Sequence, residues 1–314
     1  MNIVILDSFL VDHGELSWDG IRNFGELTIY DSTPEELISQ RVEEADIVLL
    51  NNVIFSKEKI ASAKNLKFIS MLATGYDNVD LEECRKRGIK VSNIPTYGTD
   101  TVAQFTFSLL LEICNNVKEH SDKIFSKDYI KKYEYSVPIK NQYELAGKTM
   151  GIIGYGNIGR KVSEIAKAFG MEVLAYRGEN KEKKYEEEVS LEYLLANSDV
   201  ISLHAKLTEE NFGIINKDTI SKMKDDVILI NVARGDLIVE KDLKEALDSG
   251  KILGVGIDVL SVEPIEEDNI LLSSKNLLIT PHMAWTTEEA RKRIIETVEE
   301  NIKGFLEGNY KNLV

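Results

Sequence analysis

The sequence predicts an α/β protein built from two doubly wound domains, each a parallel sheet covered by helices. Its 314 residues exceed what one ordinary hydrophobic core holds and suit two domains of about 150 residues each. Short apolar runs alternate with helical patterns from one end of the chain to the other. The spacing between most of these runs fits β-α-β crossovers, which join parallel strands.

A first series of apolar runs predicts the strands of the first domain. They are residues 3–6, 45–50, 66–72 and 89–94. Pro95 and Gly98 follow them and mark a hinge. The next stretch, 101–114, is apolar nearly all round, which indicates a buried helix.

A second series of apolar runs predicts a second parallel sheet. They are residues 149–154, 172–176, 199–203, 226–231, 252–257 and 277–280. The last helix starts at about residue 286 and carries an apolar stripe. Because that stripe needs a surface to cover, we expect the helix to return to the first domain. The residues of the stripe are Ile294, Val298, Ile302 and Phe305. The first domain is then discontinuous and comprises residues 1–98 and 286–314, and the second comprises residues 99–285.

Composition excludes several classes of protein. The net charge of -15 argues against a nucleic-acid partner, and no apolar run reaches the ~18 residues of a membrane span. The first residues enter a strand pattern directly, so we expect no signal peptide and a cytoplasmic protein. Cys84 and Cys114 lack metal-ligand spacing and are expected to be buried free thiols, so no metal site is predicted. The charged stretch 179–188 is expected to be a solvated loop or helix face.

The most informative segment is a glycine loop between a strand and a helix. Gly154, Gly156 and Gly159 form the pattern G-x-G-x-x-G. The first glycine permits a tight turn, the second lets a pyrophosphate approach the backbone, and the third lets helix and strand pack closely. The helix N-terminus adds free N–H groups and a partial positive charge. The pattern predicts that the second domain binds a dinucleotide.

The end of the next strand bears on which dinucleotide is bound. An NAD-type site has an acid there, which accepts a hydrogen bond from the ribose 2′-hydroxyl. This chain has Arg177 instead, with Glu179 as the nearby acid. Two interpretations stay open: Arg177 pairs with a 2′-phosphate, or it points into solvent and the ribose is held by other groups.

Three later loops each present a polar side chain after a strand. NVARGD places Arg234 at a strand end, GIDVLSVEP places Asp258 and then Glu263, and ITPHMAW places His282. Each residue alone has an ordinary explanation as a turn or solvated loop residue. Their common position at carboxyl strand ends, where open α/β sheets bind ligands, favours a shared site.

At this point the chain resembles the D-isomer-specific 2-hydroxyacid dehydrogenases. GIIGYGNIGR, NVARGD, GIDVLSVEP and ITPHMAW carry the resemblance, and MLATGYDNVD and TVAQFTFSLLL in the first half match as well. The motifs LDSFLVDHGELSWDG and PHMAW lean toward the glycerate dehydrogenase, or hydroxypyruvate reductase, branch. The resemblance covers nearly the whole chain.

The resemblance implies a fold and a site. The fold is a Rossmann dinucleotide-binding domain inserted in a discontinuous flavodoxin-like substrate domain, usually in a homodimer. The implied catalytic set is Arg234, Glu263 and His282. The implied substrate-binding residues are Ala73, Thr74, Gly75, Arg234 and His282. The implied cofactor-binding residues are Gly154, Gly156, Asn157, Ile158, Gly159, Arg177, His204, Lys206, Thr208, Val232, Ala233, Asp258 and His282, with Asp258 on the nicotinamide amide.

The residue types suit this chemistry. Reduction of a 2-keto acid by hydride needs an acid to protonate the new alkoxide, and His282 can supply the proton near neutral pH. Glu263 would orient the ring and favour its protonated form, and Arg234 would hold the substrate carboxylate and polarise the keto oxygen. We therefore expect an NAD(P)-dependent oxidoreductase acting on hydroxypyruvate/D-glycerate or glyoxylate/glycolate. The alternatives are a dehydrogenase for a bulkier 2-keto acid and an NAD(H)-sensing corepressor-like protein on the same fold.

Three features depart from the family pattern. Relatives usually have an acid, or a serine followed by arginine, where this chain has Arg177, and a proline where HAKLT has Lys206. Both changes add positive charge and tilt the expected cofactor toward NADP. Residues 124–143, which belong to the dimer arm in the family, lack the expected tryptophans.

The other histidines, His13, His120 and His204, are expected at the surface or at the cofactor edge, without a catalytic role.

Overall fold

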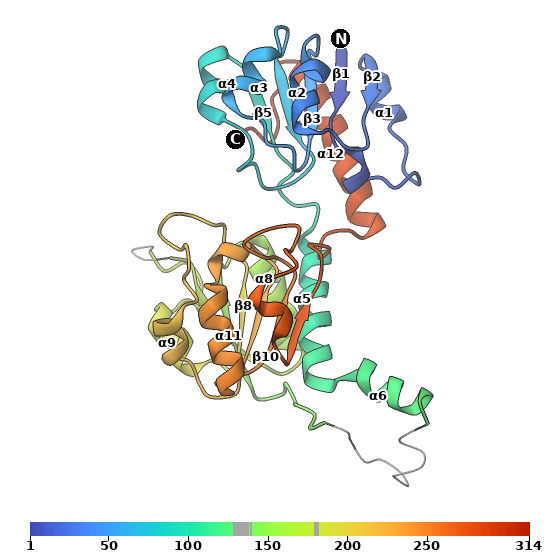
Figure 1. Ribbon diagram of the computed structural model, residues 1–314. Helices are drawn as coiled ribbons and strands as arrows, with labels where there is room; N and C mark the ends of the chain where they lie inside the picture. Colours follow the sequence, from blue (N-terminus) through green and yellow to red (C-terminus); the bar gives the residue numbers. More distant parts are fainter. Residues whose placement is uncertain (128–137, 139, 179–181) are drawn as a thin grey trace. The chain divides into compact units, whose positions relative to one another are not determined.

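The computed structural model describes residues 1–127, 138, 140–178 and 182–314. It divides into two compact units: unit 1 is Met1–Gly98 with Thr286–Val314, and unit 2 is Thr99–Trp285. The same ranges are predicted from the sequence for the two domains. Each unit contains one parallel sheet packed with helices (Figure 1), so the predicted α/β fold class is confirmed.

Unit 1 has a five-stranded parallel sheet in the order β2-β1-β3-β4-β5. The strands are β1 (Asn2–Ile5), β2 (Glu26–Ile29), β3 (Ile47–Leu50), β4 (Phe68–Met71) and β5 (Lys90–Ser92). The helices are η1 (Ser8–Leu10), α1 (Asp19–Arg22), α2 (Glu35–Val42), α3 (Lys57–Ser62), α4 (Leu81–Arg87) and α12 (Glu288–Leu306). The chain builds outward from β1 in both directions, which is the doubly wound arrangement.

Strand β2 was not predicted from the sequence. It lies at the edge of the sheet, and only Leu27 of its four residues is buried. Its residues Glu-Leu-Thr-Ile contain no continuous apolar run, the feature by which the other strands were identified, and the available signal was their short alternation of polar and apolar residues. Backbone pairing with β1 holds it in the sheet.

Helix α12 packs against the sheet of unit 1, as predicted. Ile294, Val298 and Ile302 are fully buried, and the ring of Phe305 stacks on Phe68 of β4 with centroids 4.7 Å apart. Burial of such a stripe contributes about 1.5–3 kcal/mol for each large apolar side chain. Unit 1 is therefore discontinuous because α12, at the end of the chain, buries its apolar face against a sheet formed by the first 92 residues.

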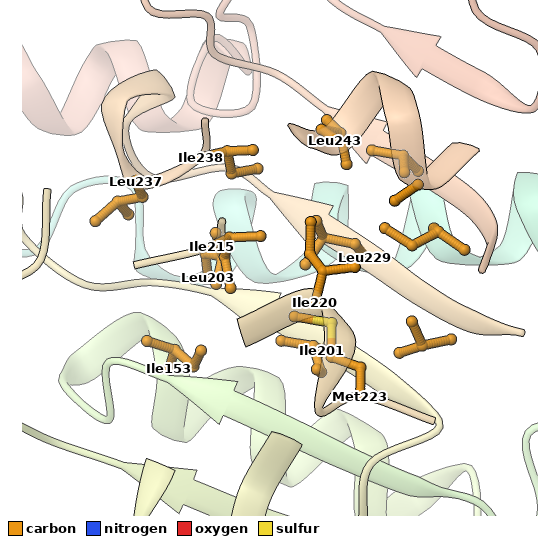
Figure 2. Close-up of a cluster of buried hydrophobic side chains, with 14 of the residues drawn as sticks. Ile153, Ile201, Leu203, Ile215, Ile220, Met223, Leu229, Leu237, Ile238 and Leu243 are labelled. Carbon is orange, nitrogen blue, oxygen red and sulfur yellow. The ribbon is translucent and has the colours of Figure 1, made fainter. Parts of the chain in front are cut away.

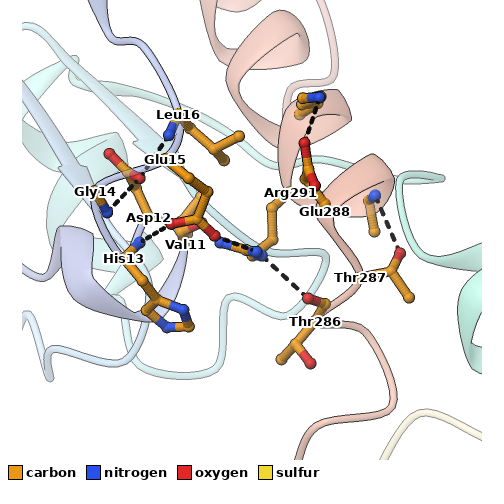
Figure 3. Close-up of polar contacts among 12 residues, drawn as sticks. Val11, Asp12, His13, Gly14, Glu15, Leu16, Thr286, Thr287, Glu288 and Arg291 are labelled. Carbon is orange, nitrogen blue, oxygen red and sulfur yellow. Dashed lines mark hydrogen bonds and ion pairs between the residues drawn. The ribbon is translucent and has the colours of Figure 1, made fainter.

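The buried guanidinium of Arg291 fastens the start of α12 to the loop after β1 (Figure 3). Its Nη2 pairs with Glu15 Oε1 at 2.5 Å, and its Nη1 donates to the Val11 carbonyl at 3.1 Å. Its Nε donates to the Thr286 carbonyl at 3.0 Å. The chain is thus anchored at the residue where it re-enters unit 1.

Unit 2 has a six-stranded parallel sheet in the order β11-β10-β9-β8-β6-β7. The strands are β6 (Thr149–Ile153), β7 (Glu172–Tyr176), β8 (Val200–Leu203), β9 (Val227–Asn231), β10 (Ile252–Ile257) and β11 (Leu277–Ile279). The helices are α5 (Thr99–Asn115), α6 (Val117–Phe125), α8 (Asn157–Ala168), α9 (Leu191–Asn197), α10 (Lys217–Ser221), η2 (Gly235–Leu237), α11 (Glu240–Ser249) and η3 (Ile270–Ser273). The strand order reverses between β6 and β8, where such sheets bind ligands.

The core of unit 2 fixes the strands whose ends carry the candidate site. Figure 2 shows Ile153 of β6, Leu203 of β8 and Leu229 of β9 in one buried cluster with Leu243 of α11. Helix α5, predicted as a buried helix, packs against α8, β9 and β10. No helix among the described residues is long and apolar enough to cross a membrane.

Two predictions about individual residues have different outcomes. Cys84 and Cys114 are buried free thiols, as expected, and burial raises the pKa of each to about 11.

The charged stretch 179–188 was expected to be solvated. Its first three residues lie outside the described residues, and the expectation is wrong for Glu187 and Glu188, which are half-buried and paired with cations.

Candidate active site

Two of the loop glycines are required by close backbone contacts. Gly154 follows β6 with a φ of +99°, and a Cβ there would lie 2.3 Å from the Ala205 nitrogen. A Cβ on Gly159 would lie 2.1 Å from the Gly154 carbonyl oxygen. A side chain at Gly154 would push the turn away from the segment after β8. A side chain at Gly159 would push α8 away from the end of β6. These contacts place the N-terminus of α8 beside the end of β6.

Gly156, in contrast, faces open space. No atom lies within 4 Å of the position of a Cβ at this residue, and Gly156 caps α8 without any side-chain hydrogen bond. Asn157 and Ile158 then begin the helix, with its first N–H groups directed outward. A side chain at Gly156 would fill the space that a phosphate needs beside those N–H groups. The residues present therefore fit a dinucleotide.

Arg177 directly follows β7 and does not point freely into solvent. Its Nη1 lies 3.0 Å from Glu188 Oε1, and its side chain is 25% exposed. Glu179, the other acid considered for the ribose, lies outside the described residues. Sequence reasoning missed Glu188, because it is one of three consecutive glutamates 11 residues after Arg177 and nothing in the run distinguishes it.

The loop after β8 lies next to the glycine turn through Ala205. His204 Nε2 lies 2.8 Å from Ser202 Oγ, and burial lowers the pKa of His204 to about 3. An imidazole with so low a pKa is neutral near pH 7. Asn211 braces the loop, since its amide donates to the Lys206 carbonyl and its Oδ1 accepts the Thr208 N–H.

His13 and His120 were expected at the surface or at the cofactor edge, and the structure places neither in the core. His13 is exposed in unit 1 with its ring against Phe9. His120 is on α6, with its Nδ1 2.8 Å from the Asn116 carbonyl oxygen.

The loop after β9 is shaped by the buried amide of Asn231. Its Oδ1 accepts the Ala233 N–H at 3.0 Å, and its Nδ2 donates to the Arg234 carbonyl at 2.8 Å. Val232 and Ala233 thereby form a tight turn that presents Arg234. The next residue, Gly235, lies so close to the loop after β10 that a Cβ would sit 1.9 Å from the Leu260 carbonyl carbon. This contact brings the Arg234 loop against the segment that carries Glu263.

Glu263 and His282 form a direct pair. Glu263 Oε2 lies 2.7 Å from His282 Nδ1, and its Oε1 accepts the Leu260 N–H at 2.9 Å. Both side chains are partly exposed, at 36% and 40%. Burial alone would raise the pKa of Glu263, but the hydrogen bond and charge of His282, the Leu260 N–H and the charge of Arg234 together lower it. The carboxylate is therefore ionised at neutral pH.

His282 occupies a strained turn that a buried aspartate holds. Its φ is +52°, in the left-handed region that few non-glycine residues adopt. Its N–H donates to the carbonyls of Asp258 and Thr280 at 2.8 and 3.0 Å. The Asp258 carboxylate accepts the Thr280 hydroxyl at 2.6 Å and the N–H groups of Met283 and Ala284 at 2.9 and 2.7 Å. Burial raises the pKa of Asp258, and these three donors oppose that rise.

In unit 1, residues 73–75 follow β4. The Thr74 hydroxyl donates to the Ile94 carbonyl at 2.6 Å, and Asn93 donates to the Thr74 carbonyl at 2.8 Å, so the side chain is turned inward. In the part of the chain that the structure describes, no acceptor is bonded to the N–H groups of Ala73, Thr74 and Gly75. These groups suit a carboxylate ligand.

The structure brings together the Arg234, Glu263 and His282 predicted to act as a set, from loops after β9, β10 and β11. It shows three supporting residues that sequence reasoning missed, namely Asn231, Gly235 and Thr280. Asn231 and Gly235 flank Arg234 within the motif NVARGD, so the motif itself was the available signal. Among the described residues, no group of three or more His, Cys, Asp or Glu side chains could hold a metal ion.

Comparison with known proteins agrees with this site. Residues 107–284 match the NAD-binding domain of the D-isomer-specific 2-hydroxyacid dehydrogenases. The chain is 45% identical to the hydroxypyruvate reductase of Blautia hydrogenotrophica, across 100% of this chain and 99% of that protein. It is 35% identical to the glycerate dehydrogenase of Methylorubrum extorquens, across 91% and 90%. An acyclic imino acid reductase solved in complex with NADPH and D-Arg superposes with a TM-score of 0.89 at 30% identity and full coverage of both chains.

A glycine loop that fits a dinucleotide, a Glu–His pair beside an arginine and similarity along the whole chain converge on one conclusion. The chain belongs to the D-isomer-specific 2-hydroxyacid dehydrogenase family and is an oxidoreductase that transfers a hydride between a nicotinamide cofactor and a small 2-hydroxy acid.

Proposed function

We propose that His282, Glu263 and Arg234 catalyse the reversible reduction of a small 2-keto acid, with hydroxypyruvate or glyoxylate as substrate and D-glycerate or glycolate as product. The observation that carries the proposal is the 2.7 Å contact between Glu263 Oε2 and His282 Nδ1. Because Nδ1 faces a carboxylate, it holds a proton, and Nε2 is the nitrogen left to serve the substrate.

The roles follow from the chemistry of the residues. A nicotinamide held in unit 2 would supply a hydride for C2 of the keto acid. His282 Nε2 gives its proton to the C2 oxygen, which completes the hydroxyl group, and it takes the proton back in the reverse direction. Glu263 stabilises the charged imidazolium, and Arg234 binds the substrate carboxylate and polarises the keto oxygen.

We assign dinucleotide binding to unit 2 and part of substrate binding to unit 1. The glycine loop and the first N–H groups of α8 support the first assignment, and the N–H groups of residues 73–75 support the second. Contacts of His204, Lys206, Thr208, Val232 and Ala233 with the cofactor stay predictions, as does a hydrogen bond from the nicotinamide amide to Asp258.

The names of the relatives favour hydroxypyruvate and glyoxylate over bulkier 2-keto acids. The intact Arg–Glu–His set favours turnover over a purely sensing role. A panel of 2-keto acids of increasing size, assayed with NADH and with NADPH, separates these possibilities. Highest kcat/KM on a branched or aromatic keto acid would replace the proposed substrate class.

For the cofactor, we propose that NADPH is used at least as well as NADH. Arg177 stands where an acid would repel a 2′-phosphate, and its guanidinium can pair with that phosphate.

We also propose a cytoplasmic homodimer. The observation behind self-association is helix α6, where Val117, Ile124 and Phe125 are 63%, 45% and 83% exposed and no residue is buried. Large apolar side chains exposed together on one helix are typical of an interface. The predicted dimer arm 124–143 lies only in part within the described residues.

We expect His282→Ala to retain dinucleotide binding and to lower kcat by about 100- to 10,000-fold, because general acid catalysis is lost while the glycine loop is untouched. His13→Ala, which removes an exposed histidine of unit 1, is the control and should keep wild-type turnover. Steady-state kinetics and dinucleotide titration measure both effects. Wild-type activity in His282→Ala would refute the assignment.

Glu263→Gln should shift the pH profile of keto-acid reduction. The carboxylate, whose pKa is lowered by His282 after the opposing effect of burial, stabilises the protonated ring. A neutral amide no longer offers a charge that favours the protonated ring, so the decline of the rate on the alkaline side should begin at lower pH. Glu266→Gln, in the same exposed loop, should leave the profile unchanged. Identical profiles for Glu263→Gln and wild type would contradict the pairing.

Arg177→Asp should move the cofactor preference toward NADH. The change removes a partner for the 2′-phosphate and adds a repelling charge, so KM for NADPH rises while kcat changes little. The ratio of kcat/KM for the two cofactors in both proteins is the measurement. A wild type strongly selective for NADH, with no change in ratio on substitution, would show that Arg177 does not meet the ribose.

A further inference from the structure

A cluster of cations surrounds one aromatic ring after β7. The guanidinium carbons of Arg160 and Arg177 lie 5.8 and 5.5 Å from the ring centroid of Tyr185, and the ammonium of Lys184 lies 5.6 Å from it. Arg160 belongs to the first turn of α8, directly after the last loop glycine. The cluster therefore joins the glycine loop to the end of β7, where dinucleotide-binding domains recognise the ribose.

One acid, Glu188, is built into this cluster. A parallel bridge pairs Ala175 of β7 with Glu188, which fixes the glutamate alongside the strand that ends before Arg177. Its Oε1 accepts Arg177 Nη1 at 3.0 Å and the N–H groups of Lys184 and Tyr185 at 3.1 and 2.9 Å. Its side chain is only 9% exposed. Glu188 is thus held in one place by three donors.

The carboxylate is ionised and keeps one oxygen available. Burial would raise the pKa of Glu188, but the hydrogen bond from Arg177 and the two backbone N–H groups outweigh it and lower the pKa. In the described part of the chain, its Oε2 has no hydrogen-bond partner, and it is not among the fully buried unbonded atoms.

The Glu188 carboxylate affects the binding of the two cofactors in opposite ways. A 2′-phosphate has to compete with Oε1 for Arg177 and is repelled by the carboxylate charge. A 2′-hydroxyl carries no charge and can donate a hydrogen bond to a carboxylate oxygen such as Oε2. The acid missing at position 177 is thereby replaced by one from the following loop, 11 residues later in the sequence.

Resting on the proposed function of this site, we propose that Glu188 sets the cofactor selectivity by neutralising Arg177, so that NADH is retained as a cofactor and selectivity for NADPH is limited. Arg177 attracts a 2′-phosphate, and Glu188 weakens that attraction.

The test is Glu188→Gln, which keeps the size of the side chain and an oxygen for the Lys184 and Tyr185 N–H groups but removes the charge. Dissociation constants of NADPH and NADH are measured by the fluorescence of the bound dinucleotide, without substrate. Glu186→Gln is the matched control, because it removes the same charge from an exposed neighbour. Arg177→Gln and the double variant Arg177→Gln/Glu188→Gln complete a double-mutant cycle.

We expect Glu188→Gln to bind NADPH about 3- to 10-fold more tightly, while the NADH dissociation constant changes less than about twofold, as loss of one partly screened charge implies. Glu186→Gln should match wild type. The gain should be clearly smaller in the Arg177→Gln background, because the competition for the arginine is absent there and only the direct repulsion by the carboxylate remains to be removed.

A ratio of dissociation constants within twofold of wild type in Glu188→Gln would overturn the proposal, as would an equal weakening of both dinucleotides. Persistence of the full gain without Arg177 would do the same. If the wild type bound neither dinucleotide at millimolar concentration, the proposed function itself would fail. An unchanged ratio with normal binding would leave that function standing and remove only the role of Glu188.

Discussion

The buried carboxylate of Asp258 holds the turn from which His282 projects, and the candidate active site of unit 2 depends on it. Three donors converge on this carboxylate from Thr280, Met283 and Ala284, and they close the segment after β11 into a fixed shape. The left-handed backbone at His282 costs free energy, on the order of 1 kcal/mol or more. Such a conformation persists where several contacts specify it together. Because this backbone is fixed, the His282 ring is already placed beside Glu263.

The parallel sheet explains why distant residues gather at one edge. Strands β9, β10 and β11 are neighbours in the sheet and run in the same direction, so the loops after them emerge side by side. Gly235 then lets two of these loops touch through their backbones. Further along the same sheet, β6 and β8 meet at the reversal of strand order, and the turn at Gly154 follows β6 there. The groups proposed to bind the dinucleotide and to transfer the proton therefore lie along the carboxyl ends of one parallel sheet.

Local patterns predicted much of this arrangement. The glycine spacing identified the turn at Gly154, and the periodicity of α12 predicted its return to the first sheet. Residues whose role depends on contacts distant in sequence were not predictable in this way. Strand β2 shows only a four-residue alternation of polar and apolar residues in place of the apolar runs that mark the other strands, and Glu188 resembles the glutamates beside it until β7 places it against Arg177. Asp258 was identified as a site residue, but the hydrogen bonds that make it the support of His282 involve backbone groups that no sequence pattern displays.

The central claim is that Glu263 fixes the proton of His282 on Nδ1 and leaves Nε2 to exchange a proton with the substrate. With four histidines in the chain, nitrogen-15 NMR of histidine-labelled protein resolves the ring, and the His282→Ala spectrum assigns it. The account predicts that Nδ1 stays protonated throughout a pH titration while Nε2 gains and loses its proton. A neutral ring protonated on Nε2, with a bare Nδ1 facing Glu263, would contradict it.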